Sequence, residues 1–241
     1  MKILKYINAD NNIILSDDPE ELRILQAQGK AVVGVLTENN RGEDFSGIQY
    51  LVENPEEIED EDYFRIWQRL KGQPWEILET ERFLVRETTV EDVDSFYEIY
   101  AEPGITDYTE DLFEDKDEEI QYTIDYAQNV YALYEYGVWT VLDKTTGQVV
   151  GRAGLSMREG FEIPELGYVI RREYQQRGVA TEVCSAILSY GKHTLGFEKV
   201  QALTKRENVA SERLLKKLGF SFEGEVVVDG EEFDCYVLDM R

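Results

Sequence analysis

The residues with the clearest chemical signature form a short loop ahead of a predicted helix. The run Gln175-Gln176-Arg177-Gly178-Val179-Ala180-Thr181 follows an apolar, strand-like segment and opens a segment with helical spacing. The first N–H groups of a helix have no partner within the helix and lie at the positive end of its dipole, so they bind phosphates well. Gly178 lets a ligand approach the backbone without a Cβ in the way. The loop therefore indicates a pyrophosphate site, to which Arg177, with Arg171 or Arg172, would add positive charge.

Few other residues belong to the types that act as nucleophiles or bind metals. Cys184 and Cys235 are the only cysteines, and His193 is the only histidine. They form no Cys/His cluster with metal-ligand spacing, and two cysteines do not make a disulfide framework. Both cysteines occupy apolar-type positions, so we expect core residues rather than a covalent nucleophile. We predict no metal site, and we assign no role to His193, which lies near the end of a predicted helix.

The segments around the loop predict a mixed α/β domain over residues 75–241. Strands are indicated by short apolar or alternating runs, and helices by apolar residues three to four positions apart. The expected strands cover residues 83–86, 138–142, 148–157, 165–170, 199–204, 220–228 and 233–240. The expected helices cover residues 90–100, 118–134, 179–195 and 208–218, and glycines end the last two.

Residues 1–72 predict a smaller α/β module. We expect strands at 13–15, 31–36 and 48–52, one helix that ends at Gln28 and a second over 56–70. The first helix has a strong start in Asp17-Asp18-Pro19-Glu20-Glu21, with a capping side chain, an early proline and acids at the positive end of the dipole. Lys71-Gly72-Gln73-Pro74 is the expected boundary.

The segment over residues 16–36 is similar to one stretch of haloacid-dehalogenase-like phosphatases, where a strand, a helix and a strand follow in this manner. The nucleophile motif of that family, Asp-x-Asp after a first strand, is absent. We therefore interpret the first module as a non-catalytic accessory, which could mediate dimerisation or restrict access to an acceptor site.

Four motifs in the larger part resemble, in order, those of the GNAT superfamily of N-acetyltransferases. Gln175, Gly178 and Ala180 match the pyrophosphate loop of that family, Q/R-x-x-G-x-G/A. Residues 80–92 and 165–168 resemble the first strand and helix and the fourth strand of the subgroup that acetylates ribosomal proteins at N-terminal alanine or serine. Residues 208–220 match the N-x-x-S…G-F segment of that subgroup. The resemblance implies a central mixed, mostly antiparallel sheet flanked by helices, with the fourth and fifth strands splayed apart.

The resemblance also implies an acetyl-CoA-dependent N-acetyltransferase in which a primary amine attacks the thioester directly, with no metal. The pyrophosphate would then lie against the loop and the helix start. The pantetheine arm would pair with the backbone of Tyr168, Val169 and Ile170, whose N–H groups could stabilise negative charge on the thioester oxygen. In the last motif, Asn208 and Ser211 would face the same arm. The phosphate-side residues are Gln175, Gln176, Arg177, Gly178, Val179, Ala180 and Thr181.

The amine must lose a proton before it attacks. At pH 7 this costs about 4–5 kcal/mol for a lysine-type amine and about 1 kcal/mol for an α-amine. Glu165, at the start of the fourth strand, is the candidate base, with Glu162 in reserve. Many family members have a tyrosine seven residues after the asparagine as proton donor, but Leu215 stands there, so Ser211 or a water held by Asn208 is the candidate donor. Alternatively, Glu165 is a solvated strand-end carboxylate and Ser211 an ordinary helix residue.

The composition of the chain limits the kinds of molecule that it is expected to bind. The 241 residues include 25 basic and 50 acidic residues, a net charge of −25, which argues against nucleic acid. No apolar run is long enough to span a membrane, and the start lacks the apolar region of a signal peptide, so we expect a cytoplasmic protein. A homodimer stays open.

The expected acceptor is an amine of a small molecule or of a peptide. Tyrosines and acids over residues 107–136 would form either a cationic acceptor groove or a solvated helix face. The alternative function is a GNAT-fold sensory module that binds acyl-CoA without transferring the acyl group, an alternative to which Leu215 gives some weight.

Overall fold

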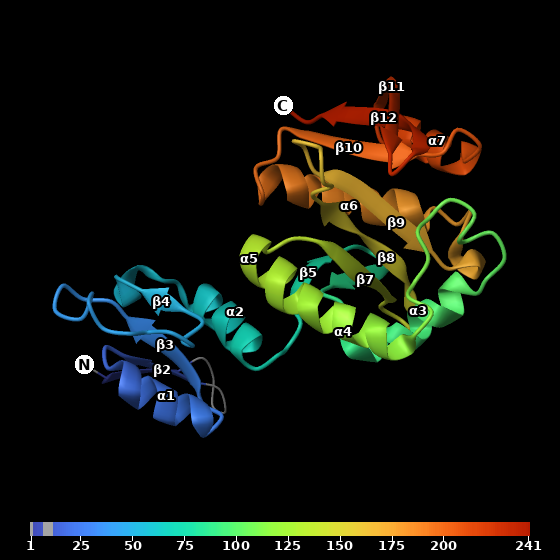
Figure 1. Cartoon of the computed structure of the whole chain (residues 1–241). Coiled ribbons are helices and arrows are strands. Elements are labelled where there is room, and N and C mark those ends of the chain that lie inside the picture. The colour runs from blue at the N-terminus through green and yellow to red at the C-terminus, as the bar shows by residue number, and fades with distance from the viewer. Residues whose placement is uncertain (1, 7–11) are drawn as a thin grey trace. The chain divides into compact units, whose positions relative to one another are not determined.

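The computed structural model describes residues 2–6 and 12–241, and the chain divides into two compact units at Trp75 and Glu76 (Figure 1). The division lies next to the glycine- and proline-containing segment over residues 71–74. Each unit has its own sheet and its own buried apolar clusters.

The first unit has a four-stranded sheet between two helices. Its strands are β1 (Lys2–Tyr6), β2 (Asn12–Ser16), β3 (Ala31–Val35) and β4 (Leu51–Val52), in this order. Strand β1 is antiparallel to β2, whereas β2, β3 and β4 are parallel. Alternate strand residues face opposite sides, so Ile13 and Val33 pack against Tyr63 of α2 (Asp60–Leu70), and Ile14 and Val32 pack against Leu22 of α1 (Pro19–Ala27).

Helix α1 begins as the sequence predicted. Oδ1 of Asp18 accepts hydrogen bonds from the N–H groups of Glu20 and Glu21, and Pro19 is the first helical residue. The expected helix over 56–70 is interrupted: a 3₁₀ turn, η1 (Pro55–Glu57), is followed by extended backbone at Ile58. The expected strand over 48–52 is shorter, because Ile48 instead packs into the cluster beside α1.

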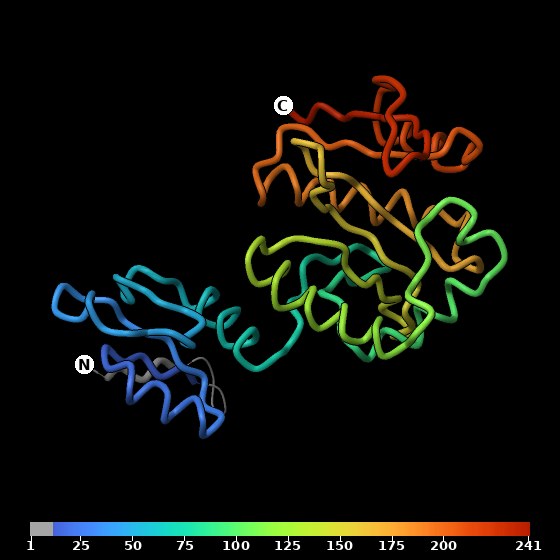
Figure 2. Tube along the Cα trace, in the orientation of Figure 1, coloured from blue at the N-terminus to red at the C-terminus, as the bar shows by residue number. Residues whose placement is uncertain are grey.

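The second unit is built on an eight-stranded sheet with the order β11-β12-β10-β9-β8-β7-β6-β5. All neighbours are antiparallel except β9 and β10. The last hairpin lies at one edge of the sheet, where Figure 2 shows it in red. The strands are β5 (Glu76–Glu79), β6 (Phe83–Arg86), β7 (Val138–Asp143), β8 (Val149–Ser156), β9 (Glu165–Ile170), β10 (Lys199–Thr204), β11 (Ser221–Val228) and β12 (Glu231–Asp239).

Helices cover both faces of this sheet. Neighbouring strand residues reveal the two sides: Val150 and Ile170 pack with α6 (Val179–His193), whereas Val149 and Val169 pack with Phe96 of α3 (Val93–Tyr100). We call these the α6 face and the α3 face. Helix α7 (Val209–Lys217) contacts α6 and β10.

The expected helix over 118–134 contains a π-helical turn. It consists of α4 (Lys116–Tyr126), the π-helix η3 (Ala127–Tyr131) and α5 (Ala132–Tyr134). The hydroxyl of Tyr126 accepts a hydrogen bond from the N–H of Val138, and the hydroxyl of Tyr131 donates one to the carbonyl of Val138. A π turn aligns residues five apart, so it brings both tyrosines to the first residue of β7. Tertiary hydrogen bonds thus override the regular helical spacing.

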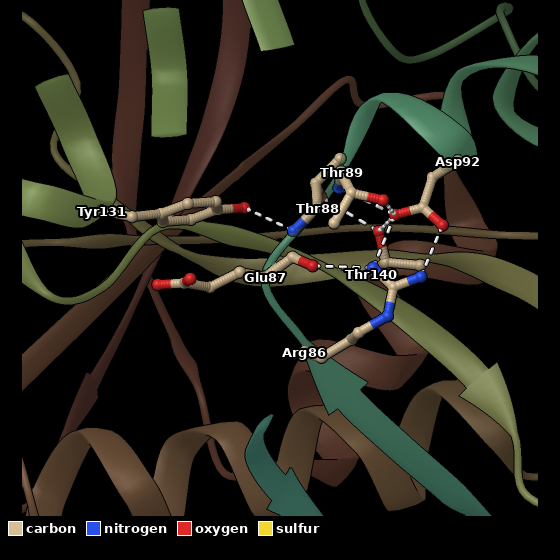
Figure 3. Close-up of polar contacts among 7 residues, drawn as sticks. All are labelled: Arg86, Glu87, Thr88, Thr89, Asp92, Tyr131 and Thr140. Carbon is tan, nitrogen blue, oxygen red and sulfur yellow. Dashed lines mark hydrogen bonds and ion pairs between the residues drawn. The ribbon is translucent and has the colours of Figure 1, made fainter. Parts of the chain in front are cut away.

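A buried polar cluster ties α3 to the sheet (Figure 3). Arg86 of β6 donates from Nη1 and Nη2 to the carboxylate of Asp92, at 2.6 Å each. The same carboxylate accepts from the N–H of Thr89 at 2.9 Å and from Oγ1 of Thr140, on β7, at 2.9 Å. Asp92 ends the 3₁₀ turn η2 (Val90–Asp92) just before α3, so this cluster fixes where the helix leaves the strand.

Candidate active site

Strands β9 and β10 separate soon after they meet. Among the described residues their ladder contains one pair, Gln201 with Glu165, next to a hydrogen bond from the N–H of Gln201 to the carbonyl of Pro164. On its other side, β9 pairs with β8 along all six residues. The β10-facing edge of β9 beyond Glu165 is therefore outside the sheet ladder. An extended ligand with amide groups can pair with such an edge.

The loop predicted to bind phosphates lies between β9 and α6, after the 3₁₀ turn η4 (Arg172–Tyr174). Gly178 has φ +77° and forms the N-cap of α6, a left-handed conformation that glycine adopts at no steric cost. Gln175 is fixed by its side chain, whose Nε2 donates to the carbonyl of Ile170 at 2.9 Å. Gln176 and Arg177 are exposed, and Val179, Ala180 and Thr181 form the first turn of the helix. The helix N-terminus is thus open beside the free edge of β9.

Arg82, the residue directly before β6, supports this loop. Nη2 of Arg82 donates to the carbonyl of Arg177 at 3.2 Å, and Nε of Arg82 donates to Glu182 in the first turn of α6 at 2.7 Å. Although burial acts to raise it, hydrogen bonds from Thr80 and Arg82 hold the pKa of Glu182 below its usual value. Arg82 belongs to the first motif of the sequence, but no local pattern indicated that it would reach a loop 95 residues away.

On the α6 face, Tyr168 and Ser211 meet across the separated strands. The hydroxyl of Tyr168 donates to Oγ of Ser211 at 3.0 Å. Asn208 caps α7: its Oδ1 accepts from the N–H of Ser211 at 3.0 Å. Burial raises the pKa of Tyr168 to about 12. The structure therefore brings together Tyr168, Asn208 and Ser211, which the sequence assigned to one ligand arm.

On the opposite face, Glu165 is buried and held by an arginine. Arg158, in the loop between β8 and β9, donates from Nε to Oε2 of Glu165 at 2.6 Å and from Nη2 to Oε1 at 3.2 Å. These hydrogen bonds raise the pKa of the Arg158 guanidinium. Its Nη1 lies 3.5 Å from the exposed Glu110, in the segment between α3 and α4. Glu165 is therefore not a solvated strand-end carboxylate, and sequence reasoning missed its partner Arg158.

Alternation along β9 places the two candidate proton-transfer groups on different sides. Tyr168 packs with the α6-face cluster, whereas Val169 packs with the α3-face cluster. Glu165 is three residues before Tyr168 and four before Val169, so it shares the α3 face with Val169. A thioester between β9 and β10 would have Glu165 on one side and Ser211 on the other.

The remaining residues with reactive side chains lie elsewhere or in the core. Cys184 and Cys235 are buried, as expected, and burial raises the pKa of the Cys184 thiol to about 12. Arg171 pairs with Glu98 of α3 at 3.1 Å, so its charge is directed away from the loop. Leu215 is 1% exposed and belongs to the core. In the described part of the chain, no group of three or more acidic, cysteine or histidine residues could hold a metal ion.

No helix within residues 2–6 and 12–241 is long and apolar enough to cross a membrane.

Of the six tyrosines over residues 107–136, Tyr131 is buried, Tyr126 and Tyr136 are half-buried, and Tyr108, Tyr122 and Tyr134 are exposed. Tyr126 and Tyr131 hydrogen-bond to the first residue of β7, which favours a structural role for these two tyrosines.

Fold and site together define a mixed sheet with two diverging strands, β9 and β10, and a glycine-capped helix start in the loop that follows β9. A sequence model described as an acetyltransferase (GNAT) domain matches residues 82–221. The chain belongs to the GNAT family of acetyltransferases. The expected GNAT fold is confirmed, as is the expected N-acetyltransferase activity.

Relatives support the same family assignment, and a solved structure supports the fold. The uncharacterized N-acetyltransferase YoaA of Bacillus subtilis (strain 168) is 32% identical over 154 residues, which are 61% of this chain and 84% of the relative. The spermidine N(1)-acetyltransferase of Escherichia coli (strain K12) is 35% identical over 63 residues, 26% of this chain and 34% of the relative. The ribosomal-protein-S5-alanine acetyltransferase of Vibrio fischeri has a similar fold, with a TM-score of 0.58 at 18% identity, and covers 67% of this chain and 95% of its own.

Proposed function

We propose that the unit over residues 76–241 transfers the acetyl group of acetyl-CoA to a primary amine of a cationic small molecule or of a protein N-terminus. The observation that carries this proposal is the free edge of β9, which leads from the N-terminus of α6 to Ser211 on one face and to Glu165 on the other. We expect this reaction in the cytoplasm.

The residues around the free edge fit acetyl-CoA, which supplies the activated acetyl group. The open N–H groups of Val179, Ala180 and Thr181, with Gly178 and the exposed Gln176 and Arg177, would hold the pyrophosphate. Gln175 fixes the loop to the end of β9. The backbone groups of Tyr168, Val169 and Ile170 would pair with the pantetheine amides and donate to the thioester oxygen as negative charge develops on it.

The acceptor would approach from the α3 face, where Glu165 lies. We propose that Glu165 accepts the proton of the amine, directly or through a water. Because Arg158 already donates to both carboxylate oxygens, the amine must use their remaining lone pairs or displace the guanidinium toward Glu110. Glu162, the reserve candidate, is exposed in the preceding loop.

Charge supports a cationic acceptor. The chain carries a net charge of −25, and Glu110 lies in an acidic segment next to the Glu165–Arg158 pair. Such a surface concentrates cations and accelerates their arrival. The relative from Escherichia coli that acetylates spermidine belongs to the same group of similar proteins. We therefore place polyamines ahead of neutral amines as acceptors.

The test is a thiol-release assay with acetyl-CoA and a panel of polyamines, lysine-type amines and N-terminal peptides. Wild type is compared with Glu165→Gln and with Glu162→Gln as the matched control. We expect Glu165→Gln to lower kcat by about 100-fold or more, as for loss of a general base, and Glu162→Gln to leave it within about twofold. Equal losses in both variants, or loss in Glu162→Gln alone, would remove Glu165 as the base.

A further inference from the structure

The hydrogen bond between Tyr168 and Ser211 crosses the space where the two strands separate. Tyr168 lies three residues beyond Glu165, the last β9 residue that pairs with β10. Ser211 lies in the first turn of α7, the helix that follows β10. Their hydroxyl oxygens are 3.0 Å apart. The contact therefore joins the two sides of the proposed acetyl-CoA channel, 43 residues apart in sequence.

The surroundings of Ser211 restrict where its hydroxyl hydrogen can point. A serine hydroxyl has one hydrogen to donate and two lone pairs to accept. Because Tyr168 donates to Oγ of Ser211, the Ser211 hydrogen is not needed for that contact. The N–H of Ser211 is fixed by Asn208, which orients the first turn of α7. A tyrosine phenol is protonated at neutral pH and has one hydrogen to donate, and burial raises the pKa of Tyr168 further, to about 12.

We propose that Tyr168 is a positioning residue: its hydroxyl donates to Ser211 and thereby aims the Ser211 hydrogen at the sulfur of the leaving CoA. The inference rests on the proposed function. As the carbon–sulfur bond breaks, its electron pair stays on sulfur, and the Ser211 hydroxyl donates a hydrogen bond to the thiolate. Neither hydroxyl gives up its proton. The surplus proton of the amine goes to Glu165 or water, and the thiolate takes its proton from solvent after release.

In this arrangement the hydrogen bond to sulfur does not come from position 215, on the buried face of α7. Leu215 is apolar and 1% exposed, so it offers no hydrogen to sulfur. Tyr168 instead approaches from β9 and acts through Ser211. The pair would stabilise charge where it develops, which is worth more in a site sheltered from water than at a surface.

The sharpest test is the thiol pKa of CoA bound to the full chain, followed by thiolate absorbance as pH is varied. It needs no acceptor amine. We expect Ser211→Ala to raise the thiol pKa by about one unit and Tyr168→Phe by about half a unit, the sizes expected for a lost and a weakened hydrogen bond to a charged group. The double variant should match Ser211→Ala alone, because Tyr168 acts through Ser211. Ser211→Thr, which keeps a hydroxyl, should restore most of the shift.

Tyr190→Phe is the matched control. Tyr190 lies on α6 and packs edge-on against Trp139 of the same core, so the variant makes the same chemical change away from the pair. We expect it to leave the thiol pKa and kcat unchanged, whereas Tyr168→Phe lowers kcat about fivefold with the KM for acetyl-CoA unchanged. Equal thiol pKa values in wild type and Tyr168→Phe would overturn the inference whatever the turnover assay shows. No turnover by wild type with any amine would instead overturn the proposed function.

Discussion

At the scale of single residues, the Asp92 carboxylate shows how much of this fold depends on paired charge. Its side chain is 3% exposed and accepts from Arg86, Thr89 and Thr140 (Figure 3). A buried charge that loses its partner costs far more than an exposed one, because water cannot replace the lost contacts. The cluster therefore sets where α3 begins, and through α3 it supports the side of the sheet on which Glu165 lies.

Removing that charge should destabilise the second unit. We expect Asp92→Asn to lower the free energy of unfolding by about 3 kcal/mol, because it leaves Arg86 without its ion pair. Asp94→Asn is the control: Asp94 is 76% exposed and pairs with Lys116 at the surface, so we expect a change below about 1 kcal/mol. Urea titration of both variants measures the difference. Similar losses in the two would show that the buried cluster contributes nothing special.

Sequence reasoning found site residues whose role is local and missed those whose role depends on distant contacts. Gln175, Gly178 and Asn208 act within a few residues of their own position, as loop, N-cap and helix cap, so their motifs indicated them. Arg158 and Arg82 matter through partners on other elements. Nothing in their immediate sequence specifies those partners.

At the scale of elements, the N-terminus of α6 is the feature on which the proposed binding of acetyl-CoA depends. Gly178 has φ +77°, and Gly147, in the turn between β7 and β8, has φ +72°. An alanine at either position should cost about 1 kcal/mol of stability, because both are left-handed. We expect Gly178→Ala also to weaken acetyl-CoA binding by about tenfold or more, since its Cβ intrudes on the phosphate path.

Gly147→Ala is therefore the matched control, with the same strain and an unchanged dissociation constant for acetyl-CoA. Calorimetric titration of both variants separates the two effects. If the two alanines weaken binding equally, or neither does, the loop before α6 does not hold the phosphates.

Element order could be predicted almost completely, whereas element ends depended on tertiary contacts. Apolar periodicity indicated β9, α6, β10 and α7 because each buries one face in a common core. The π turn at Ala127–Tyr131 could not be predicted, because it exists to bring Tyr126 and Tyr131 to Val138. The short edge strands β1 and β5 were missed, since edge strands carry a weaker apolar pattern.

At the scale of the whole molecule, the net charge of −25 should act on the two substrates with opposite sign. A cationic acceptor is attracted and the phosphates of acetyl-CoA are repelled, and salt screens both effects. Raising the ionic strength from about 0.01 M to about 0.15 M shortens the screening length from about 30 Å to about 8 Å. We expect the KM for a polyamine to rise several-fold and the KM for acetyl-CoA to fall.

An acceptor whose only charge is its reacting amine serves as the control and should respond weakly. Steady-state kinetics at several salt concentrations provides the comparison. If both KM values rise together, salt acts on folding or on the loop rather than through the charge of the whole surface.

The central claim is that this chain transfers the acetyl group of acetyl-CoA to an amine. The most direct measurement combines thiol release from acetyl-CoA with the mass of the amine product, using the full chain and a polyamine. We predict that thiol release requires the amine and that the product gains one acetyl group for each thiol released. Both signals should be lost when acetyl-CoA is left out of the reaction. Tight acetyl-CoA binding with no thiol release and no acetylated product across the whole amine panel would contradict the claim and indicate a module that binds the ligand without transferring its acetyl group.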